Sequence, residues 1–346
     1  MYSSYLTLIV PAAIALAVTY ISALFLRSYL FEAGVTSVDH NKRRKPVLAS
    51  SGGVAVAFGF SVGVLAYIFG ASFGMYTPKA SLVDLFAVVL SVLLISFVGF
   101  IDDINVSKVL VKTTDMMDHR KGLKQWQKPL LTFIGAVPLM AVNAGIHTLN
   151  IPFLGVVNFG IFYPLVLLPL AIVFAANAFN LLGGFDGISS GSGLIASLGL
   201  LVYSIIFGTY VGAVVSAIVC AAAFAFLLFD RYPATMLSGD SFTYCMGAAM
   251  AAAMIIGSME AFGIVVFMPW IIEFLLHLRR RFKVKDLGNL RSDGTFEPPY
   301  GKKIYSWTHL IMNLRRCKEW EVSLYMWTIE LGFVLLAFAL KALGLL

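Results

Sequence analysis

Asp102 and Asp103 are two adjacent carboxylates that follow an apolar run at 81–101. Like charges so close together repel each other, and at the carboxyl end of a helix they also oppose the helix dipole. A divalent cation, a lysine or a basic ligand must therefore offset them, and we expect the pair to take part in chemistry. The simpler alternative is a pair of solvated acids at an interface.

A second polar segment runs from Asn177 to Gly187 between two apolar stretches. Asn177 and Asn180 are three residues apart, so they share a helix face. The glycines at 183–184 predict a break in the helix and allow a ligand to approach the backbone closely. Asp186 follows in a predicted turn. Polar groups at a broken membrane helix indicate a polar cavity, whereas the simpler alternative is an ordinary interhelical turn.

Asp240 begins another apolar run. An aspartate at this position is most often a helix cap. Beside other acids it is also a suitable ligand for Mg²⁺, which binds one or two protein oxygens and completes its octahedron with phosphate and water.

Glu273, His277 and Arg279–Arg281 end a further apolar run. On a helix, Glu273, His277 and Arg280 or Arg281 lie along one face. Arginine binds phosphate through two parallel hydrogen bonds. A topological signal at the end of a membrane span explains the arginines equally well.

The elements that position these groups are predicted to be membrane helices. Of the 346 residues, 60% are hydrophobic and 12% are charged, with a mean hydropathy of +0.88. Soluble domains carry about a quarter charged residues, so lipid must solvate much of this chain. We expect an all-α polytopic membrane protein, a single integral domain over 1–346, with a cytoplasmic loop at about 279–322. The ten predicted spans are 4–27, 52–74, 81–101, 129–146, 161–180, 190–208, 210–229, 241–257, 259–278 and 323–345.

The lysines and arginines follow this division of the chain. All except Lys79 and Lys341 fall in or beside the loops after the first, third, seventh and ninth spans. The positive-inside rule places these loops in the cytoplasm and both termini outside it. The net charge of +7 therefore indicates topology and a polyanionic ligand, and not nucleic acid. Three cysteines without CxxC spacing exclude a disulfide framework. Soluble nucleotide-binding motifs and the HExxH metalloprotease motif are absent.

In this order and on ten spans, these segments resemble the polyprenyl-phosphate N-acetylhexosamine-1-phosphate transferases of glycosyltransferase family 4. The resemblance covers Asp39 to Tyr305 and is most specific at Gly-Phe-Ile-Asp-Asp and at Asn-Ala-Phe-Asn-Leu-Leu-Gly-Gly-Phe-Asp-Gly. It is closest to the dolichol-type GlcNAc-1-phosphate transferases of eukaryotes and archaea, through the segment that starts at Gly239 and through Phe267-Met-Pro. The chain departs from the pattern at Ser50 and Leu237, where the eukaryotic enzyme has donor-base contacts.

The resemblance implies a role for each matching residue. Asp102 and Asp103 would form the catalytic acid pair near the acceptor phosphate, and Lys128 would contact phosphate. Asn180 and Asp240 would hold Mg²⁺, or Mn²⁺ in its place, on the donor diphosphate. Asp186 would lie near the uridine. The arginines stand near the place of the family's three-histidine cluster and would bind the diphosphate or the sugar. The full set of residues implied to bind substrate is Lys42, Asn177, Asp186, His277, Arg279, Arg280 and Arg281.

The implied reaction transfers GlcNAc-1-phosphate from UDP-GlcNAc to a dolichyl-type polyprenyl phosphate and releases UMP. This would be the first membrane step of glycan assembly, for N-glycosylation or a surface polysaccharide. It would take place at the cytoplasmic face of a cell membrane, or of the ER membrane in a eukaryote, and an archaeal source is favoured. Another UDP-N-acetylhexosamine, undecaprenyl phosphate as acceptor, and a homodimer all stay open.

Two further expectations concern mechanism and class. We expect direct attack by the lipid phosphate, with an aspartyl-phosphate intermediate as the alternative, and an apolar groove for the lipid tail beside the acids. The competing class is an ion-coupled transporter, because spans, a broken helix and acids also suit an ion pathway. No inverted repeat is visible, however, and the acids gather at one interface.

Overall fold

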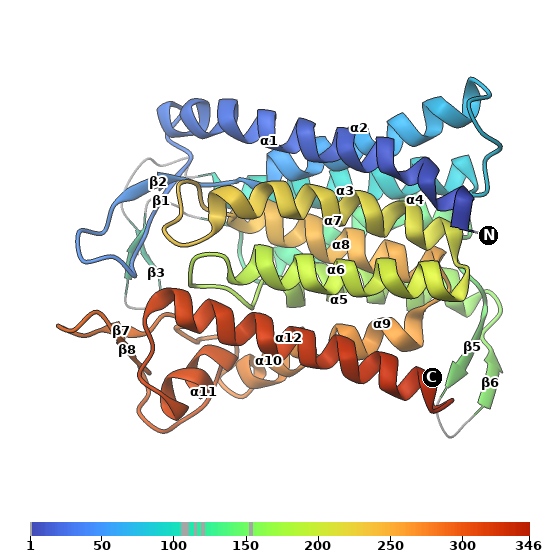
Figure 1. The fold of residues 1–346 in the computed structure, drawn as a ribbon. Coiled ribbons are helices and arrows are strands. Elements are labelled where there is room, and N and C mark those ends of the chain that lie inside the picture. Colours follow the sequence, from blue (N-terminus) through green and yellow to red (C-terminus); the bar gives the residue numbers. More distant parts are fainter. Residues whose placement is uncertain (1, 105–110, 114–115, 119–121, 152–154) are drawn as a thin grey trace.

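The computed structural model describes residues 2–104, 111–113, 116–118, 122–151 and 155–346. Lys108, Arg120 and Lys121, three of the cations used to orient the chain, lie outside the described residues. The described part is a bundle of helices with short hairpins at its two ends (Figure 1). The helices are α1 (Ile9–Glu32), α2 (Gly53–Ser72), α3 (Leu82–Asp103), α4 (Gln127–Ala141), α5 (Leu168–Phe179), α6 (Ile188–Phe207), α7 (Tyr210–Asp230), α8 (Gly239–Ile256), α9 (Glu260–Val266), α10 (Met268–Leu278), α11 (Trp307–Leu314) and α12 (Glu319–Ala342). A 3₁₀ turn at Tyr2–Leu8 precedes α1, and a π-helical turn at Tyr163–Leu167 leads into α5.

Four two-stranded antiparallel hairpins complete the described fold. Their strands are β1 (Thr36–Val38) with β2 (Val47–Ala49), β3 (Val111–Thr113) with β4 (Met116–Asp118), β5 (Thr148–Ile151) with β6 (Gly155–Asn158), and β7 (Asn289–Leu290) with β8 (Phe296–Glu297). The first, second and fourth hairpins and α11 lie at one end of the bundle, whereas β5, β6 and both chain termini lie at the other (Figure 1).

The structure is consistent with the expected polytopic architecture, but fewer described helices than the ten predicted spans are long enough to cross a membrane. Among the described residues, seven helices are long and apolar enough to cross a membrane, and the pair α9 and α10, bent by 59°, makes an eighth if it is one span. The other two predicted spans correspond to the 15-residue α4 and to the shorter apolar helix Tyr163–Phe179. The bend follows Phe267, where Pro269 opens α10; a proline is tolerated in a first helical turn but cannot continue the preceding hydrogen-bond ladder.

The central helix is α8, which packs against α2, α3, α5 and α7. Two glycines allow α2 and α3 to approach its first turn closely. A Cβ on Gly53 would lie 1.9 Å from the backbone nitrogen of Phe242, and a Cβ on Gly99 would lie 2.4 Å from the carbonyl oxygen of Asp240. Any larger side chain would separate these helices, so the sequence brings the end of α3 directly to the start of α8.

Candidate functional site

Asp103, the last residue of α3, binds the beginning of α8. Its carboxylate accepts hydrogen bonds from the backbone amides of Asp240 (2.8 Å) and Ser241 (3.1 Å), and from the hydroxyl of Ser51. The first amides of a helix lack partners within it, and they form the positive end of its dipole. Asp103 therefore caps α8 from another helix. Asp240 lies inside the first turn of α8 and is not its cap.

Asp102 faces a different set of partners. One of its oxygens accepts the backbone amide of Leu123, and Oδ2 lies 2.5 Å from the ammonium of Lys128. The same ammonium lies 3.4 Å from Oδ2 of Asp240. Asp102 and Asp240 are buried. The structure thus brings together two predicted acids from α3 and α8 around a predicted lysine from α4.

Asn180 follows the last residue of α5 and lies beside the same turn of α8. Its side-chain oxygen accepts a hydrogen bond from Thr243 (2.6 Å), whose hydroxyl is also 3.1 Å from the carbonyl oxygen of Asp240. Asn177 has a different position: its amide donates to Thr132 (3.0 Å) and to the carbonyl of Val173 (2.8 Å). Asn177 therefore joins α5 to α4.

A polar cavity of about 460 Å³ lies beside Asp102, Lys128, Asn180 and Asp240. The predicted break lies where the glycines at 183–184 stand, in the loop between the end of α5 at Phe179 and the start of α6 at Ile188. The resulting loop forms part of the wall. Of the predicted site residues, the cavity is lined by Asp102, Lys128, Asn180, Asp186 and Asp240.

Lys42 and Asp186 meet at another part of this cavity region. The ammonium of Lys42 lies 2.7 Å from Asp186, 3.1 Å from Asp39 and 2.6 Å from Glu319. Burial alone would lower the pKa of Lys42, but hydrogen bonds to Asp186 and Glu319 outweigh it and raise that pKa above its ordinary value. Burial, together with the charge of Asp186, raises the pKa of the Asp39 carboxyl.

Sequence reasoning missed four acids of this region: Asp39, Asp230, Asp286 and Glu319. Glu319 begins α12, beyond the segment that carries the resemblance. Asp230, the last residue of α7, lines the cavity and accepts a hydrogen bond from Ser190 (2.6 Å). Asp230 stands at the end of an apolar run, so the argument applied to Asp102 and Asp240 would have found it, whereas Glu319 lies in a charged segment at 315–321 that gives no such signal.

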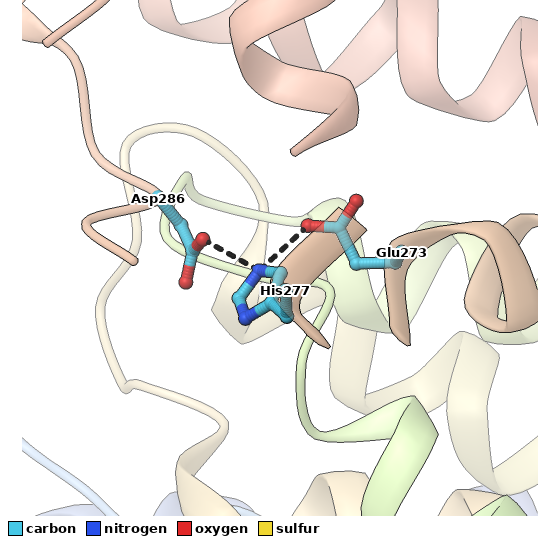
Figure 2. Close-up of side chains that lie close together, drawn as sticks. All are labelled: Glu273, His277 and Asp286. Atoms are coloured by element: carbon cyan, nitrogen blue, oxygen red, sulfur yellow. Dashed lines mark hydrogen bonds and ion pairs between the residues drawn. The ribbon is translucent and has the colours of Figure 1, made fainter. Parts of the chain in front are cut away.

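His277 lies behind the cavity wall and not in it. Figure 2 shows its ring between Glu273 and Asp286, with Nε2 3.2 Å from the first carboxylate and 2.9 Å from the second. Glu273 also accepts the backbone amide of Trp307 (2.9 Å) at the start of α11. Because Asp286 lines the cavity, His277 links α10 to the cavity wall.

Arg279–Arg281 line a separate open hollow of about 610 Å³ together with Tyr300, Lys303 and Tyr305. The guanidinium of Arg280 lies 4.3 Å from the centre of the Tyr300 ring. Within the described chain, these arginines are not part of the wall that holds Asp102, Lys128 and Asp240.

An apolar cavity of about 270 Å³ lies between α5, α8 and the bent pair α9 and α10. Its wall is almost wholly aliphatic and aromatic, with Phe174, Met254, Phe267 and Ile271 among the lining residues.

The donor set of Asp240 and Asn180 fits Mg²⁺ or Mn²⁺. Carboxylate and amide oxygens are the protein ligands that these ions prefer. Two other groups have ligand atoms within 4.8 Å of one another: Asp39, Asp186 and Glu319, and Glu273, His277 and Asp286. In the first the Lys42 ammonium binds all three carboxylates, and in the second the histidine ring binds both acids.

Known proteins are similar in sequence to this chain over almost its whole length. The family model described as glycosyl transferase family 4 matches residues 85–258. A protein of Saccharolobus solfataricus named "Putative UDP-N-acetylglucosamine--dolichyl-phosphate N-acetylglucosaminephosphotransferase" is 30% identical over 338 residues, 97% of each chain. A protein of Sulfolobus acidocaldarius with the same name is 30% identical over 339 residues, again 97% of each. A phospho-N-acetylmuramoyl-pentapeptide-transferase of Halalkalibacterium halodurans is 28% identical over 344 residues, 97% of each.

Proposed function

The chain belongs to glycosyl transferase family 4, and we propose that it transfers GlcNAc-1-phosphate from UDP-GlcNAc to a dolichyl-type polyprenyl phosphate, releasing UMP. The observation that carries the proposal is the likeness of nearly the full chain to the two archaeal relatives of that name. The cavity supports it, because Asp102, Lys128 and Asp240 meet there at the ends of three helices. A transporter is less well supported, since these groups lie at the ends of α3, α4 and α8 and not midway along them.

The reaction joins two anions. An oxygen of the acceptor phosphate forms a bond to the β-phosphorus of the donor, the bond from that phosphorus to the bridging oxygen breaks, and UMP leaves with the electron pair. A phosphate monoester has a second pKa of about 6, so the acceptor is largely ionised at neutral pH and needs little help from a base. The protein must mainly offset charge and align the reactants.

Lys128 is the cation best placed for this task. Asp102 and Asp240 hold its ammonium at the cavity wall, so it can contact a phosphate without reorganising. A Mg²⁺ ion held by Asp240 and Asn180 would neutralise charge on the donor diphosphate. Where a proton remains on the acceptor, Asp102 is the carboxylate placed to accept it. The oxygens of Asp103 already bind the start of α8.

The other substrate-binding roles follow from position. Lys42 and Asp186 would contact the donor nucleoside, and Asn177 would hold α5 in place behind Asn180. His277 would keep Asp286 in the wall. The hollow of Arg279–Arg281 would attract polyanionic substrates toward the cavity. The apolar cavity between α5 and α10 would take part of the lipid tail.

We further propose ten crossings, with both termini outside the cytoplasm and the catalytic cavity on its inner face. The two termini lie at one end of the bundle, as an even number of crossings requires (Figure 1). The hairpin of β1 and β2, which carries Lys42, and the segment from α10 to β7, which begins with Arg279–Arg281, lie toward the opposite end (Figure 1), in line with the positive-inside rule. The membrane would be the cell membrane.

A reconstitution assay tests the function. Purified protein in lipid nanodiscs receives Mg²⁺, UDP-GlcNAc and dolichyl phosphate, and UMP release is measured. We expect release that depends on all three additions. Parallel reactions with UDP-GalNAc and with undecaprenyl phosphate identify the sugar and the lipid. If no UDP-N-acetylhexosamine yields UMP with either lipid, the proposal is wrong and transport becomes the better hypothesis.

A further inference from the structure

Glu319 is a buried carboxylate at the first residue of α12, outside the segment that the family model matches. Its Oε2 lies 2.6 Å from the ammonium of Lys42. Its Oε1 lies 3.4 Å from the side-chain amide of Asn41 and 3.4 Å from the backbone amide of Asp186. One carboxylate therefore joins α12 to the loop after α1 and to the loop between α5 and α6.

The backbone of Asp186 is held by α12 on both sides of its Cα. Glu319 accepts its N–H, and the hydroxyl of Ser323 donates to its carbonyl oxygen at 2.7 Å. Glu319 and Ser323 are four residues apart, so they lie one turn apart on the same helix face. The Asp186 carboxylate also binds Lys42 and the backbone amide of Ala234 (2.9 Å).

Lys42 is fixed in the same way. A lysine has four rotatable side-chain bonds, and ordering it on ligand binding costs conformational entropy. Here its ammonium is bound by Asp39, Asp186 and Glu319 and lies 4.7 Å from the centre of the Tyr232 ring. The side chain is therefore already ordered before a ligand arrives, which lowers the cost of binding one.

The surroundings of Lys42 suit the uncharged nucleoside of the donor better than its diphosphate. Three carboxylates surround one ammonium, so a phosphate would be repelled here, whereas Lys128 offers a cation elsewhere in the cavity wall. Ribose hydroxyls and the N–H of a pyrimidine base can donate to the carboxylates, and the ribose hydroxyls and the carbonyl oxygens of the base can accept from the ammonium. The charge pattern thus orients a nucleoside diphosphate with its nucleoside toward Lys42.

We propose that Glu319 is a positioning residue for the donor nucleoside, acting by holding Lys42 and Asp186 in their binding positions. The inference rests on the proposed function, because it assigns this end of the cavity to the nucleoside. Glu319 itself need not touch the substrate. Its loss should therefore weaken donor binding and leave the acceptor and the chemical step largely unchanged.

The test is Glu319→Gln, which keeps the shape of the side chain and removes its charge. Hydrogen bonds to charged groups typically contribute enough that we expect the KM for UDP-GlcNAc to rise about tenfold, with kcat and the KM for dolichyl phosphate within about twofold. Binding of UMP to the purified protein, measured by calorimetry, should weaken by a similar factor. Glu319→Asp, which keeps the charge, should restore part of the loss.

Glu321→Gln is the matched control, because Glu321 lies in the same first turn of α12 but accepts a hydrogen bond from the backbone amide of Lys318 (2.7 Å) and not from Lys42 or Asp186. It should leave the donor KM unchanged. A donor KM and a UMP affinity within about twofold of wild type in Glu319→Gln would overturn the inference, as would an equal rise in both KM values. The UMP measurement needs no turnover, so an inactive wild-type protein would count against the proposed function and still decide this inference.

Discussion

Asp102 and Asp103 are neighbours in the chain, yet their carboxylates bind different parts of the structure. Asp103 accepts the amides of Asp240 and Ser241, whereas Asp102 lies 2.5 Å from the ammonium of Lys128. The helix α3 ends at this pair, so successive side chains point to α8 and to α4. The pair thus divides into Asp103, which binds the start of α8, and Asp102, which lines the polar cavity beside Lys128.

Asp102→Asn and Asp103→Asn should therefore fail differently. Removing the charge at Asp102 should lower UMP release about 10²- to 10⁴-fold, the range for a lost acid–base or charge-positioning group, with a small change in stability. Removing it at Asp103 weakens hydrogen bonds of a charged acceptor to α8 and should lower the free energy of unfolding by about 1.5–3 kcal/mol. Thermal unfolding in detergent and single-turnover UMP release separate the two effects. Equal loss of stability in both variants would contradict the division.

Lys128→Met should remove most of the activity. The methionine keeps an unbranched side chain but leaves Asp102 and Asp240 without the ammonium they share. We expect kcat to fall about 10²- to 10³-fold, as for other preorganised groups that stabilise a developing charge. Lys124→Met is the control, since Lys124 is exposed and precedes the same helix. Comparable activity in both variants would exclude Lys128 as the phosphate-contacting cation.

Asp240→Asn should change the response to Mg²⁺. A neutral amide is a weaker ligand for a hard cation than a carboxylate, so the Mg²⁺ concentration for half-maximal UMP release should rise. We expect a shift of about tenfold or more, while EDTA abolishes wild-type activity. Asp293→Asn, on the exposed β7–β8 turn, serves as the control. An unchanged Mg²⁺ titration in Asp240→Asn would remove Asp240 from the metal site.

The local features of this site could be predicted from the sequence, but not all of their partners. Asp102, Asn180 and Asp240 were identified because a polar side chain at the end of an apolar run is costly without a function. That argument uses only residues that are close together in the sequence. The bond from Asp103 to the amide of Asp240 joins residues 137 apart, and nothing local distinguishes it from a catalytic role.

The same limit applies to the bent helix pair and to the arginines. Pro269 belongs to a motif that the sequence shows, but the 59° angle between α9 and α10 accompanies packing that the sequence does not: α10 packs against α5 and α12, and α9 packs against α8 and α12. Arg279–Arg281 were placed near the substrate by resemblance, and only the course of the chain after α10 shows that they line their own hollow. Whether they contribute to binding stays a prediction.

Gly99→Ala should damage stability and activity together, because it acts on the contact that positions both acids. Its new Cβ would lie 2.4 Å from the carbonyl oxygen of Asp240, a backbone atom that cannot move aside alone. The end of α3 must then shift away from α8, which strains the Asp103 cap and displaces Asp102 from Lys128. Overpacking of this kind costs about 1–3 kcal/mol, more than the roughly 1 kcal/mol that alanine gains over glycine in a helix.

Gly332→Ala is the matched control, since Gly332 also lies in a long helix, α12, and a Cβ there would meet nothing within 4 Å. The helix-propensity gain then stands alone, so this variant should be as stable as wild type or slightly more so, with unchanged UMP release. Thermal unfolding and turnover measured side by side decide the matter. If Gly99→Ala matched Gly332→Ala in both, close contact between α3 and α8 would not be what holds Asp102 and Asp103 in place.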